Sequence, residues 1–594
     1  MRSTPRTNKR KPRDSGAVTS KRLRVVLMLM LMLLSVLAAR LAQLQGLDPQ
    51  GYAAQAQAAG LVHLILPASR GEILDRSGHV LAESVAGDMI VADPTMTVGN
   101  AADLAKLLTD RLRLDYFTTL QALTTDKTAT GTPLRFAYIA RRVPADRASA
   151  VVAAANKAGW SGLFLNDDPI RYYPGDDLAA NILGFVNGQG QPGGGLEQSL
   201  NSILSGHDGA QTYESGDGAR IPLGENTEIA PIDGQAVHLT IDRDVQWMAQ
   251  TLLRQAVIKH GGTSGAAVVM DVHSGQILAL ADYPSFDSNH PAKASPGDWG
   301  SLATSSVYEP GSVEKVLTSS ALIDQGLVTP TTQVVVPPYV PVLGHDIHDE
   351  EVHGTEHLTL TGIIAQSSNI GMTLAARTIS STVLGRYLKA FGLGSAPHLG
   401  LPGASAGILP PPRGWNALTH ATIAFGQGVS VTAVQMAAAV NAVANGGIYV
   451  APSLILGEAH DANGHTVGSE TSTVRRVISR SAASAVAKMM QAVAEPGGTA
   501  PQTAIPGYVV SGKTGTAQEA GPSCGCYDHV AVSFAGFAPS ADPRFTVYVV
   551  VQHPFNWSSG AGTAGPVFRA LMGYLLQRYA IPPSGSPAHL PTTW

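Results

Sequence analysis

The sequence predicts a multidomain α+β protein that begins with a single transmembrane helix. At 594 residues, of which 44% are hydrophobic, the chain is too long for one ordinary domain and can fill a large core. A long apolar stretch follows a basic N-terminus. In the C-terminal half, strand-like segments stand at both ends with helical patterns between them, which is typical of an antiparallel sheet flanked by a helical lobe.

The N-terminus is strongly basic, although the whole chain has a formal net charge of −4. Residues 1–24 hold nine Lys or Arg side chains and one acid, Asp14. This composition predicts a disordered cytoplasmic tail over residues 1–22. Because the chain as a whole is slightly acidic, it offers no basic field for nucleic acid, and no nucleic-acid partner is expected.

The transmembrane helix is expected over residues 23–44. Residues 25–39 are apolar apart from Ser35, and Arg40 can extend its charge to the membrane interface. Since positive flanks stay inside, everything after residue 45 is expected outside the cytoplasm. The alternative is a cleaved signal peptide, because residues 54–56 form a small-residue cleavage pattern. That pattern lies well beyond the apolar stretch, so the anchor is favoured.

Two domains are expected beyond the anchor. Residues 45–230 combine strand-like runs with an amphipathic helix, which predicts an α/β domain; the runs are 61–66, 80–83 and 89–92, and the helix is 101–114. Residues 231–579 are expected to form the second domain. It would begin with a strand at 236–242, a helix at 245–260 and a hairpin of 266–271 with 277–280. It would end with strands at 530–537 and 544–552 and a closing helix at 565–576. Residues 580–594 are rich in Pro and Ser, which predicts a disordered tail.

Candidate chemistry starts at Ser312 and Lys315, which follow a Pro-Gly break and open a predicted half-buried helix. Residues three apart are neighbours on a helix, so the Lys315 amine can hydrogen-bond the Ser312 hydroxyl. A buried lysine with a lowered pKa can accept that proton and activate the serine. Alone, this S-x-x-K pattern is weak, because most such pairs belong to a solvated helix turn.

Two later motifs make the pattern specific. Ser367 and Asn369 supply S-x-N, and Lys513 opens a K-T-G motif. This order of three motifs is the active-site set of penicillin-binding proteins and class A β-lactamases. The chain resembles the class B penicillin-binding proteins, and among them the division-specific peptidoglycan transpeptidases. The likeness runs from about residue 25 to 575 and includes further matches at 70–76, 171–174, 195–197 and 425–428.

The resemblance implies a catalytic role for the residues of the first two motifs. Ser312 would be the nucleophile that accepts the acyl group, and Lys315 would be its general base. Ser367 would relay a proton to the leaving amine. Asn369 would hold either the substrate amide or the Lys315 amine.

The resemblance also implies how the third motif binds substrate. The charge of Lys513 and the hydroxyls of Thr514 and Thr516 would bind the terminal carboxylate of a D-Ala-D-Ala stem. Gly515 would let the substrate backbone approach closely. The backbone N–H groups of Ser312 and Thr516 would stabilise the oxyanion.

At the level of domains, the resemblance implies a non-catalytic pedestal of the penicillin-binding-protein dimerisation type over residues 45–230. Residues 231–579 would be a transpeptidase domain with the serine β-lactamase-like fold. No glycosyltransferase motif is present, so the enzyme would be monofunctional and would need no cofactor and no metal. Its partners would be peptidoglycan stem peptides, β-lactams, the membrane, a septal glycosyltransferase and other division proteins.

The same resemblance places the catalytic domain on the outer face of the bacterial cytoplasmic membrane, at the division septum. The elongation-specific transpeptidase shares every catalytic motif and stays an alternative. A β-lactam sensor or an inactive divisome scaffold is the alternative from a different class. The intact motifs and the pedestal favour a synthase over both.

Three further sets of residues stand out in the sequence. Five charged residues of the pedestal are expected to form salt-bridged interlocks, namely Arg70, Asp75, Arg76, Arg171 and Glu197. A loop with four histidines at residues 345–357 matches no tight metal-ligand pattern and is expected to rim the cleft. The only cysteines, Cys524 and Cys526, would be either strained partners or two free thiols, with no catalytic role.

Two residues depart from the family pattern, namely Glu314 and Ala404, and Ala404 stands where Leu-Pro-Gly is usually followed by Glu. Glu314 stands between the nucleophile and its base, at a position that is usually apolar in the family. Its charge is expected to face away from the catalytic pair.

Overall fold

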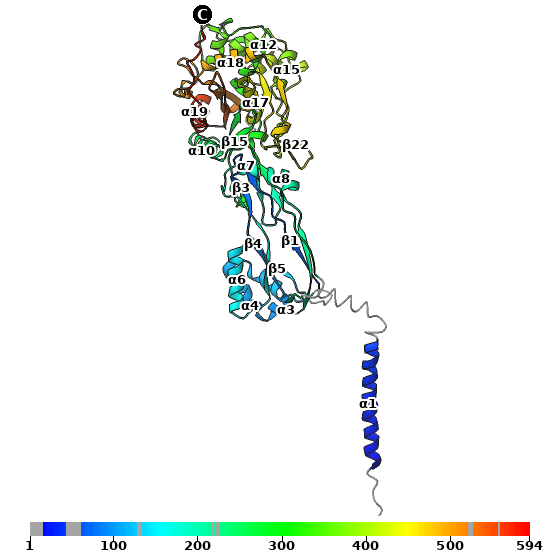
Figure 1. Cartoon of the computed structure of the whole chain (residues 1–594). Helices are drawn as coiled ribbons and strands as arrows, with labels where there is room; N and C mark the ends of the chain where they lie inside the picture. The colour runs from blue at the N-terminus through cyan, green and yellow to red at the C-terminus, as the bar shows by residue number, and fades with distance from the viewer. Residues whose placement is uncertain are drawn as a thin grey trace, which may run out of the picture.

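The computed structural model describes residues 16–42, 61–127, 134–216, 219–220, 226–520, 527–555 and 559–594. From residue 61 onward the molecule is elongated, with a large domain at one end and a small subdomain that carries α4 and α6 at the other (Figure 1). Residues 1–15, residues 54–56 and both cysteines lie outside the described residues.

One helix is long and apolar enough to cross a membrane. α1 (Gly16–Ala42) contains a candidate span at residues 23–41 with a mean hydropathy of 2.1, and none of that span is buried against the rest of the protein. The predicted apolar helix therefore forms at the expected place, because nothing in the stretch interrupts it. One such helix near the N-terminus fits a single-pass membrane protein.

The far end of the pedestal is a small three-stranded sheet covered by helices. β4 (Gly87–Ala92) lies between β5 (Ala137–Pro144) and β6 (Leu163–Asp167). Three helices pack beside this sheet around a separate apolar core, namely α4 (Ala101–Leu112), α5 (Tyr116–Thr124) and α6 (Ala145–Lys157). The amphipathic pattern at residues 101–114 thus predicted α4 correctly, because its apolar face closes this core.

Two further sheets connect this end to the large domain. β1 (Leu61–Leu66) pairs antiparallel with β10 (Gly209–Gly216), which also pairs with β12 (Asn226–Ile229). In a second sheet the strands lie in the order β13 (Val237–His238), β2 (Ile73–Leu74), β3 (Val80–Val85) and β7 (Ile170–Tyr172). The predicted strand at 236–242 is therefore short, because its partner β2 offers two residues for pairing.

Glu197 is the centre of the expected interlock. It is completely buried and accepts hydrogen bonds from the guanidinium groups of both Arg70 and Arg171, the latter at 2.6 Å. The hydroxyl of Tyr173 donates to the same carboxylate at 3.2 Å. Two arginines and a hydroxyl compensate the cost of burying this charge, so three segments distant in sequence are held together.

Asp75 and Arg76 differ from the prediction. The Asp75 carboxylate accepts the backbone N–H groups of Ser77 and His79 at 2.8 Å, so it closes a tight turn. No salt bridge links either residue to an arginine or a carboxylate elsewhere in the described ranges; the one ion pair of Asp75 is with the nearby imidazole of His79. Both residues also contact the large domain through the backbone: the N–H of Arg243 donates to Asp75 Oδ2 at 3.3 Å, and the N–H of Arg76 donates to the Ile241 carbonyl at 2.9 Å.

The large domain is built on a five-stranded antiparallel sheet in the order β15-β14-β26-β25-β24. In chain order the strands are β14 (Ser264–Asp271), β15 (Ile277–Tyr283), β24 (Ser511–Ala520), β25 (Tyr527–Ala538) and β26 (Phe545–Gln552). The strands from both ends of the domain meet in the centre, where β14 pairs with β26. This is the arrangement that the sequence predicts.

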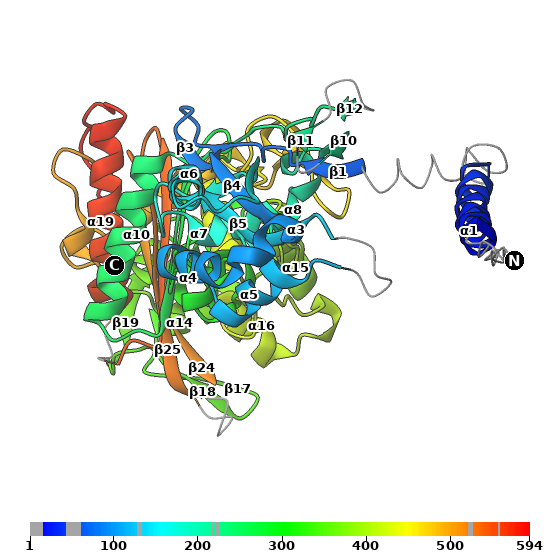
Figure 2. The ribbon, with the colours of Figure 1, turned by 90° about the horizontal axis from the view of Figure 1, so that it is seen from below.

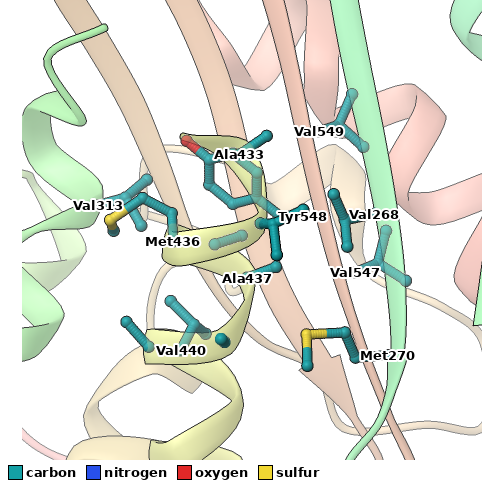
Figure 3. Packing of buried hydrophobic residues seen from close by; sticks show 14 of the residues in the cluster. Val268, Met270, Val313, Ala433, Met436, Ala437, Val440, Val547, Tyr548 and Val549 are labelled. Carbon is teal, nitrogen blue, oxygen red and sulfur yellow. The ribbon is translucent and has the colours of Figure 1, made fainter. Parts of the chain in front are cut away.

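Helices cover both faces of this sheet. α10 (Arg243–Lys259) and α19 (Gly560–Arg578) lie side by side on one face (Figure 2). On the other face, α17 (Ala433–Ala444) packs Met436 and Val440 toward the strands that carry Val268 and Tyr548 (Figure 3). Beyond α17 lies the helical lobe, with α12 (Lys315–Asp324), α13 (Leu360–Ala365), α14 (Asn369–Ala376), α15 (Ser381–Ala390), α16 (Ala417–Ala424) and α18 (Arg480–Gln491).

The C-terminal residues are ordered, in contrast to the disordered tail that composition predicts. Residues 581–594 run across the domain and reach β19 (Glu356–Thr359), where the backbone N–H of Thr359 donates to the carbonyl of Thr592 at 3.0 Å. The backbone N–H of Trp594 donates to the carbonyl of His357 at 3.2 Å. Backbone pairing of this kind needs no apolar side chains, so composition did not indicate it.

Candidate active site

The Ser312 hydroxyl lies where a short 3₁₀ turn meets the edge strand of the sheet. This turn, η5 (Gly311–Val313), runs directly into α12. Gly311 has φ +54°, and a Cβ there would lie 2.6 Å from the Thr516 carbonyl oxygen on β24. Only glycine allows this close approach of the turn to the strand. Residues 315–322 of α12 are all buried, so the helix is central rather than half-buried as predicted.

The predicted catalytic residues of the first two motifs converge on the Lys315 amine. Lys315 Nζ lies 3.0 Å from Ser312 Oγ and 2.7 Å from Asn369 Oδ1. It also donates to the backbone carbonyl of Ser367, whose hydroxyl is 3.5 Å away. Ser367 has φ +63°, a left-handed conformation that turns this carbonyl toward the amine. The amine is thus held by three acceptors from two segments.

Lys513 approaches the same centre from the sheet. Its Nζ donates to Ser367 Oγ at 2.8 Å and to the carbonyl oxygen of Thr514 at 3.1 Å. Ser367 Oγ therefore lies between the two lysine amines. Lys513 stands on β24, which pairs with β25 on one side only and leaves its other edge open to an extended ligand.

Burial lowers the pKa of both lysine amines. Lys315 is fully buried, and desolvation lowers its pKa to about 7, although the charges of Asp349, Glu350 and Glu314 act in the opposite direction. Lys513 is also fully buried, and desolvation together with the nearby Lys315 charge lowers its pKa well below the usual range. A lysine with a pKa near neutrality can serve as a general base.

The other residues of the third motif line the same strand. The Thr514 hydroxyl lies 3.3 Å from the hydroxyl of Thr499. A Cβ at Gly515 would lie 2.3 Å from Ser533 Oγ, so no side chain fits at this position. Thr516 follows opposite the turn that carries Ser312, with its side chain partly exposed. The structure therefore brings all eight predicted residues to one place.

Asp349 is a residue of this site to which the sequence assigned no role. Its carboxylate accepts the Ser368 hydroxyl at 2.6 Å and the backbone N–H groups of Asn369 and Ile370, the latter at 2.9 Å. It thereby fixes the first turn of α14, from which Asn369 reaches Lys315. The acidic loop at residues 345–357 was the only available signal, and it does rim the cleft as expected.

The histidines of this loop do not form a metal cluster. His353 lies 3.2 Å from the Asp349 carboxylate, and His348 offers its backbone carbonyl to Asn369 Nδ2 at 3.1 Å. Among the described residues, no group of three or more His, Cys, Asp or Glu side chains is placed to hold a metal ion.

Glu314 is buried beside the catalytic pair. Its side chain is fully enclosed, and it accepts the hydroxyl of Thr318, one turn along the same helix, at 2.8 Å. Burial raises its pKa well above the usual range. In the described part of the chain its side-chain hydrogen bonds run to Thr318 along α12, and a neutral carboxyl would fit the usually apolar position.

Comparison with known families decides the class of this chain. The model of the penicillin-binding protein transpeptidase domain matches residues 265–573, and the model of the penicillin-binding protein dimerisation domain matches residues 65–239. The chain is a class B penicillin-binding protein. Its pedestal corresponds to the dimerisation domain, and the site around Ser312 lies within the transpeptidase domain.

Relatives share nearly the full length of this penicillin-binding protein. Penicillin-binding protein PbpB of Mycobacterium tuberculosis is 34% identical over 95% of this chain and 85% of its own length. Peptidoglycan D,D-transpeptidase FtsI of Escherichia coli is 32% identical over 98% of this chain and 96% of its own length. The crystal structure of penicillin-binding protein 3 from Mycobacterium tuberculosis with aztreonam superposes with a TM-score of 0.68, at 30% identity, over 89% of this chain and 100% of that one.

Proposed function

We propose that this enzyme crosslinks peptidoglycan stem peptides as a D,D-transpeptidase, with Ser312 as the nucleophile and Lys315 as its general base. The observation that carries the proposal is the 3.0 Å contact between Ser312 Oγ and a buried amine whose pKa is lowered to about 7. Such an amine is largely neutral at physiological pH and can take the serine proton.

Acylation begins when the stem peptide lies along the open edge of β24. Its terminal carboxylate meets Lys513 and the hydroxyls of Thr514 and Thr516, and the arriving negative charge favours the protonated form of Lys513. The positive charge of protonated Lys513 in turn favours the neutral form of Lys315. Ser312 Oγ attacks the carbonyl of the penultimate D-Ala while its proton passes to Lys315 Nζ.

The tetrahedral intermediate collapses with loss of D-alanine. Its oxyanion is bound by the backbone N–H groups of Ser312 and Thr516, and each such donor lowers the barrier by about 3 to 4 kcal/mol. The C–N bond to the terminal D-Ala breaks as the leaving amine receives a proton through the Ser367 hydroxyl, which lies between both lysines. An amine from a second stem peptide then attacks the ester carbonyl and gives its proton to Lys315. The C–O bond to Ser312 breaks as Lys315 passes that proton to Ser312 Oγ, which restores the free serine.

The biological site of action is the division septum in this proposal, with a multispanning glycosyltransferase and other division proteins as partners. The enzyme has no polymerising motif of its own, so a separate polymerase must supply the glycan strands. Full-length likeness to the FtsI of Escherichia coli supports the division role. The elongation machinery is the alternative.

Mass spectrometry after treatment with penicillin tests the assignment of the nucleophile. The drug's strained amide mimics the D-Ala-D-Ala bond, so Ser312 alone should carry the acyl group, and Ser312→Ala should remove the label without loss of the fold. Release of D-alanine from a pentapeptide stem distinguishes the transpeptidase from a sensor or an inactive scaffold. A label on another serine would overturn the assignment.

A further inference from the structure

A large cavity lies in the transpeptidase domain away from Ser312. It has a volume of about 1090 Å³, and its walls come from α15, the loop at residues 392–398, the proline run 410–412 and the segment 471–475. None of the eight residues proposed for catalysis and substrate binding lines it. The cavity is therefore separate from the acylation site and lies at the upper end of the size range of ligand pockets.

The charges that line this cavity are all positive. Arg386, Lys389 and Arg475 contribute cationic side chains, and no Asp or Glu is among the lining residues. In the part of the chain that the structure describes, none of the three cations forms a salt bridge. Three cations around one cavity without a carboxylate partner favour an anionic ligand.

Side-chain contacts fix one wall of the cavity. The Arg475 guanidinium lies over the buried ring of Tyr449 at 3.9 Å, and its Nε donates to the Ala390 carbonyl at 2.7 Å. A Cβ at Gly392, which has φ +99°, would lie 2.8 Å from the Tyr449 hydroxyl. A wall fixed in this way loses little conformational entropy when a ligand binds.

We propose that this cavity binds a carboxylate-bearing fragment of peptidoglycan, a disaccharide with its stem peptide, at a second position on the same substrate polymer. The inference rests on the proposed function, because peptidoglycan is then the polyanion that this enzyme always meets. Each stem carries several carboxylates, which match the three cations, and the volume accommodates a ligand of that size. Hydroxyl groups of Thr382, Ser395 and Thr471 stand among the cations as partners for sugar and amide groups.

A protein segment rich in Asp and Glu is the competing occupant. Tight protein interfaces centre on a pocket that is filled by an aromatic or large aliphatic anchor. Here Tyr449, the one Phe, Tyr or Trp residue of the lining, is already covered by Arg475, so its ring is not available to such an anchor. The observations therefore favour the small polar ligand.

The test measures binding of a disaccharide tetrapeptide to the full-length protein after penicillin has acylated Ser312. The tetrapeptide lacks the D-Ala-D-Ala bond and the blocked cleft excludes it, so binding reports on the cavity. The double variant Arg386→Gln with Lys389→Gln should weaken the affinity about tenfold or more. The matched control, Lys259→Gln with Arg569→Gln, removes two exposed cations from elsewhere in the same domain and should change it less than about twofold.

Each other outcome decides against the proposal. Equal affinity of the double variant and the unaltered protein, or no saturable binding at all, would place no ligand in this cavity. Binding of polyglutamate with the same dependence on Arg386 and Lys389, and none of the tetrapeptide, would assign the cavity to an acidic protein segment. If penicillin fails to acylate Ser312, the proposed function is wrong, whereas the comparison of both double variants with the unmodified protein still measures the cavity.

Discussion

Lys315 and Lys513 are both buried beside the Ser367 hydroxyl, yet their surroundings suit them to different roles. Lys315 is held by three acceptors from η5, the Ser367 turn and α14, so its amine is fixed beside the nucleophile. Among the described residues Lys513 has hydroxyl and carbonyl partners but no carboxylate partner, and its strand lies at the edge of the sheet. The first arrangement suits proton transfer, and the second suits capture of an anion.

The rate of acylation should follow the ionisation of Lys315. Burial lowers the pKa of Lys315 to about 7, and the base must be neutral, so acylation should be slow below that pH and fast above it. The second-order rate constant for penicillin should be about tenfold lower at pH 6 than at pH 8, as a stopped-flow pH series can measure. A flat profile between these values would exclude Lys315 as the titrating base.

Exchange of each lysine for arginine should separate the two roles. Arginine cannot act as a base near neutral pH, so Lys315→Arg should nearly abolish acylation by penicillin. Lys513→Arg keeps the positive charge and should retain a measurable fraction of the rate. Equal losses in the two variants, with unchanged circular dichroism, would argue against separate roles.

Asp349 should act as a positioning residue through Asn369. In Asp349→Asn the first turn of α14 loses a charged acceptor, and we expect acylation to slow by roughly tenfold. The lost negative charge had favoured protonated Lys315, so the midpoint of the pH profile should also move to lower pH. Asp346→Asn removes an exposed carboxylate from the same loop and is the control. A lower rate with an unmoved midpoint would mean that Asp349 only stabilises the fold.

At the scale of elements, local patterns predicted much of the fold and tertiary contacts decided the rest. The central strands, α10 and the three motifs were predictable, because apolar periodicity and motif spacing are properties of short segments. The shortness of β13 and the role of Asp349 were not, since each depends on a partner distant in sequence. The C-terminal segment was mispredicted for the same reason, because its contacts are made by backbone groups.

That C-terminal segment should support the S-x-N motif. It pairs with β19, which leads through α13 to Ser367, and a Cβ at Gly362 would lie 1.9 Å from the Thr592 carbonyl oxygen. Deletion of residues 588–594 should therefore lower the free energy of unfolding by about 2 kcal/mol and slow acylation several-fold. Thermal unfolding and penicillin labelling measure the two effects. The control is His589→Gln, a change on the exposed surface of the segment. Unaltered acylation in the deletion variant would contradict a supporting role of the C-terminal segment.

At the scale of the whole molecule, buried ion pairs brace the pedestal internally, and a shared sheet joins it to the transpeptidase domain. β13 from the start of the large domain pairs in parallel with β2 of the pedestal. Within the pedestal, the buried Glu197 carboxylate forms ion pairs with both Arg70 and Arg171. Because burying unpaired charge is costly, these ion pairs favour one arrangement of the segments that they join, which suits a support for a catalytic domain outside the membrane.

Depletion of the protein in its host should test the septal role. If the enzyme works at the septum as proposed, loss of crosslinking there should stop constriction while the lateral wall continues to grow. Light microscopy should then show long filaments with unfinished septa, and a plasmid copy carrying Ser312→Ala should fail to restore division although it is made and inserted in the membrane. Round, swollen cells that still divide would instead identify the enzyme as the elongation transpeptidase, with the same chemistry at Ser312.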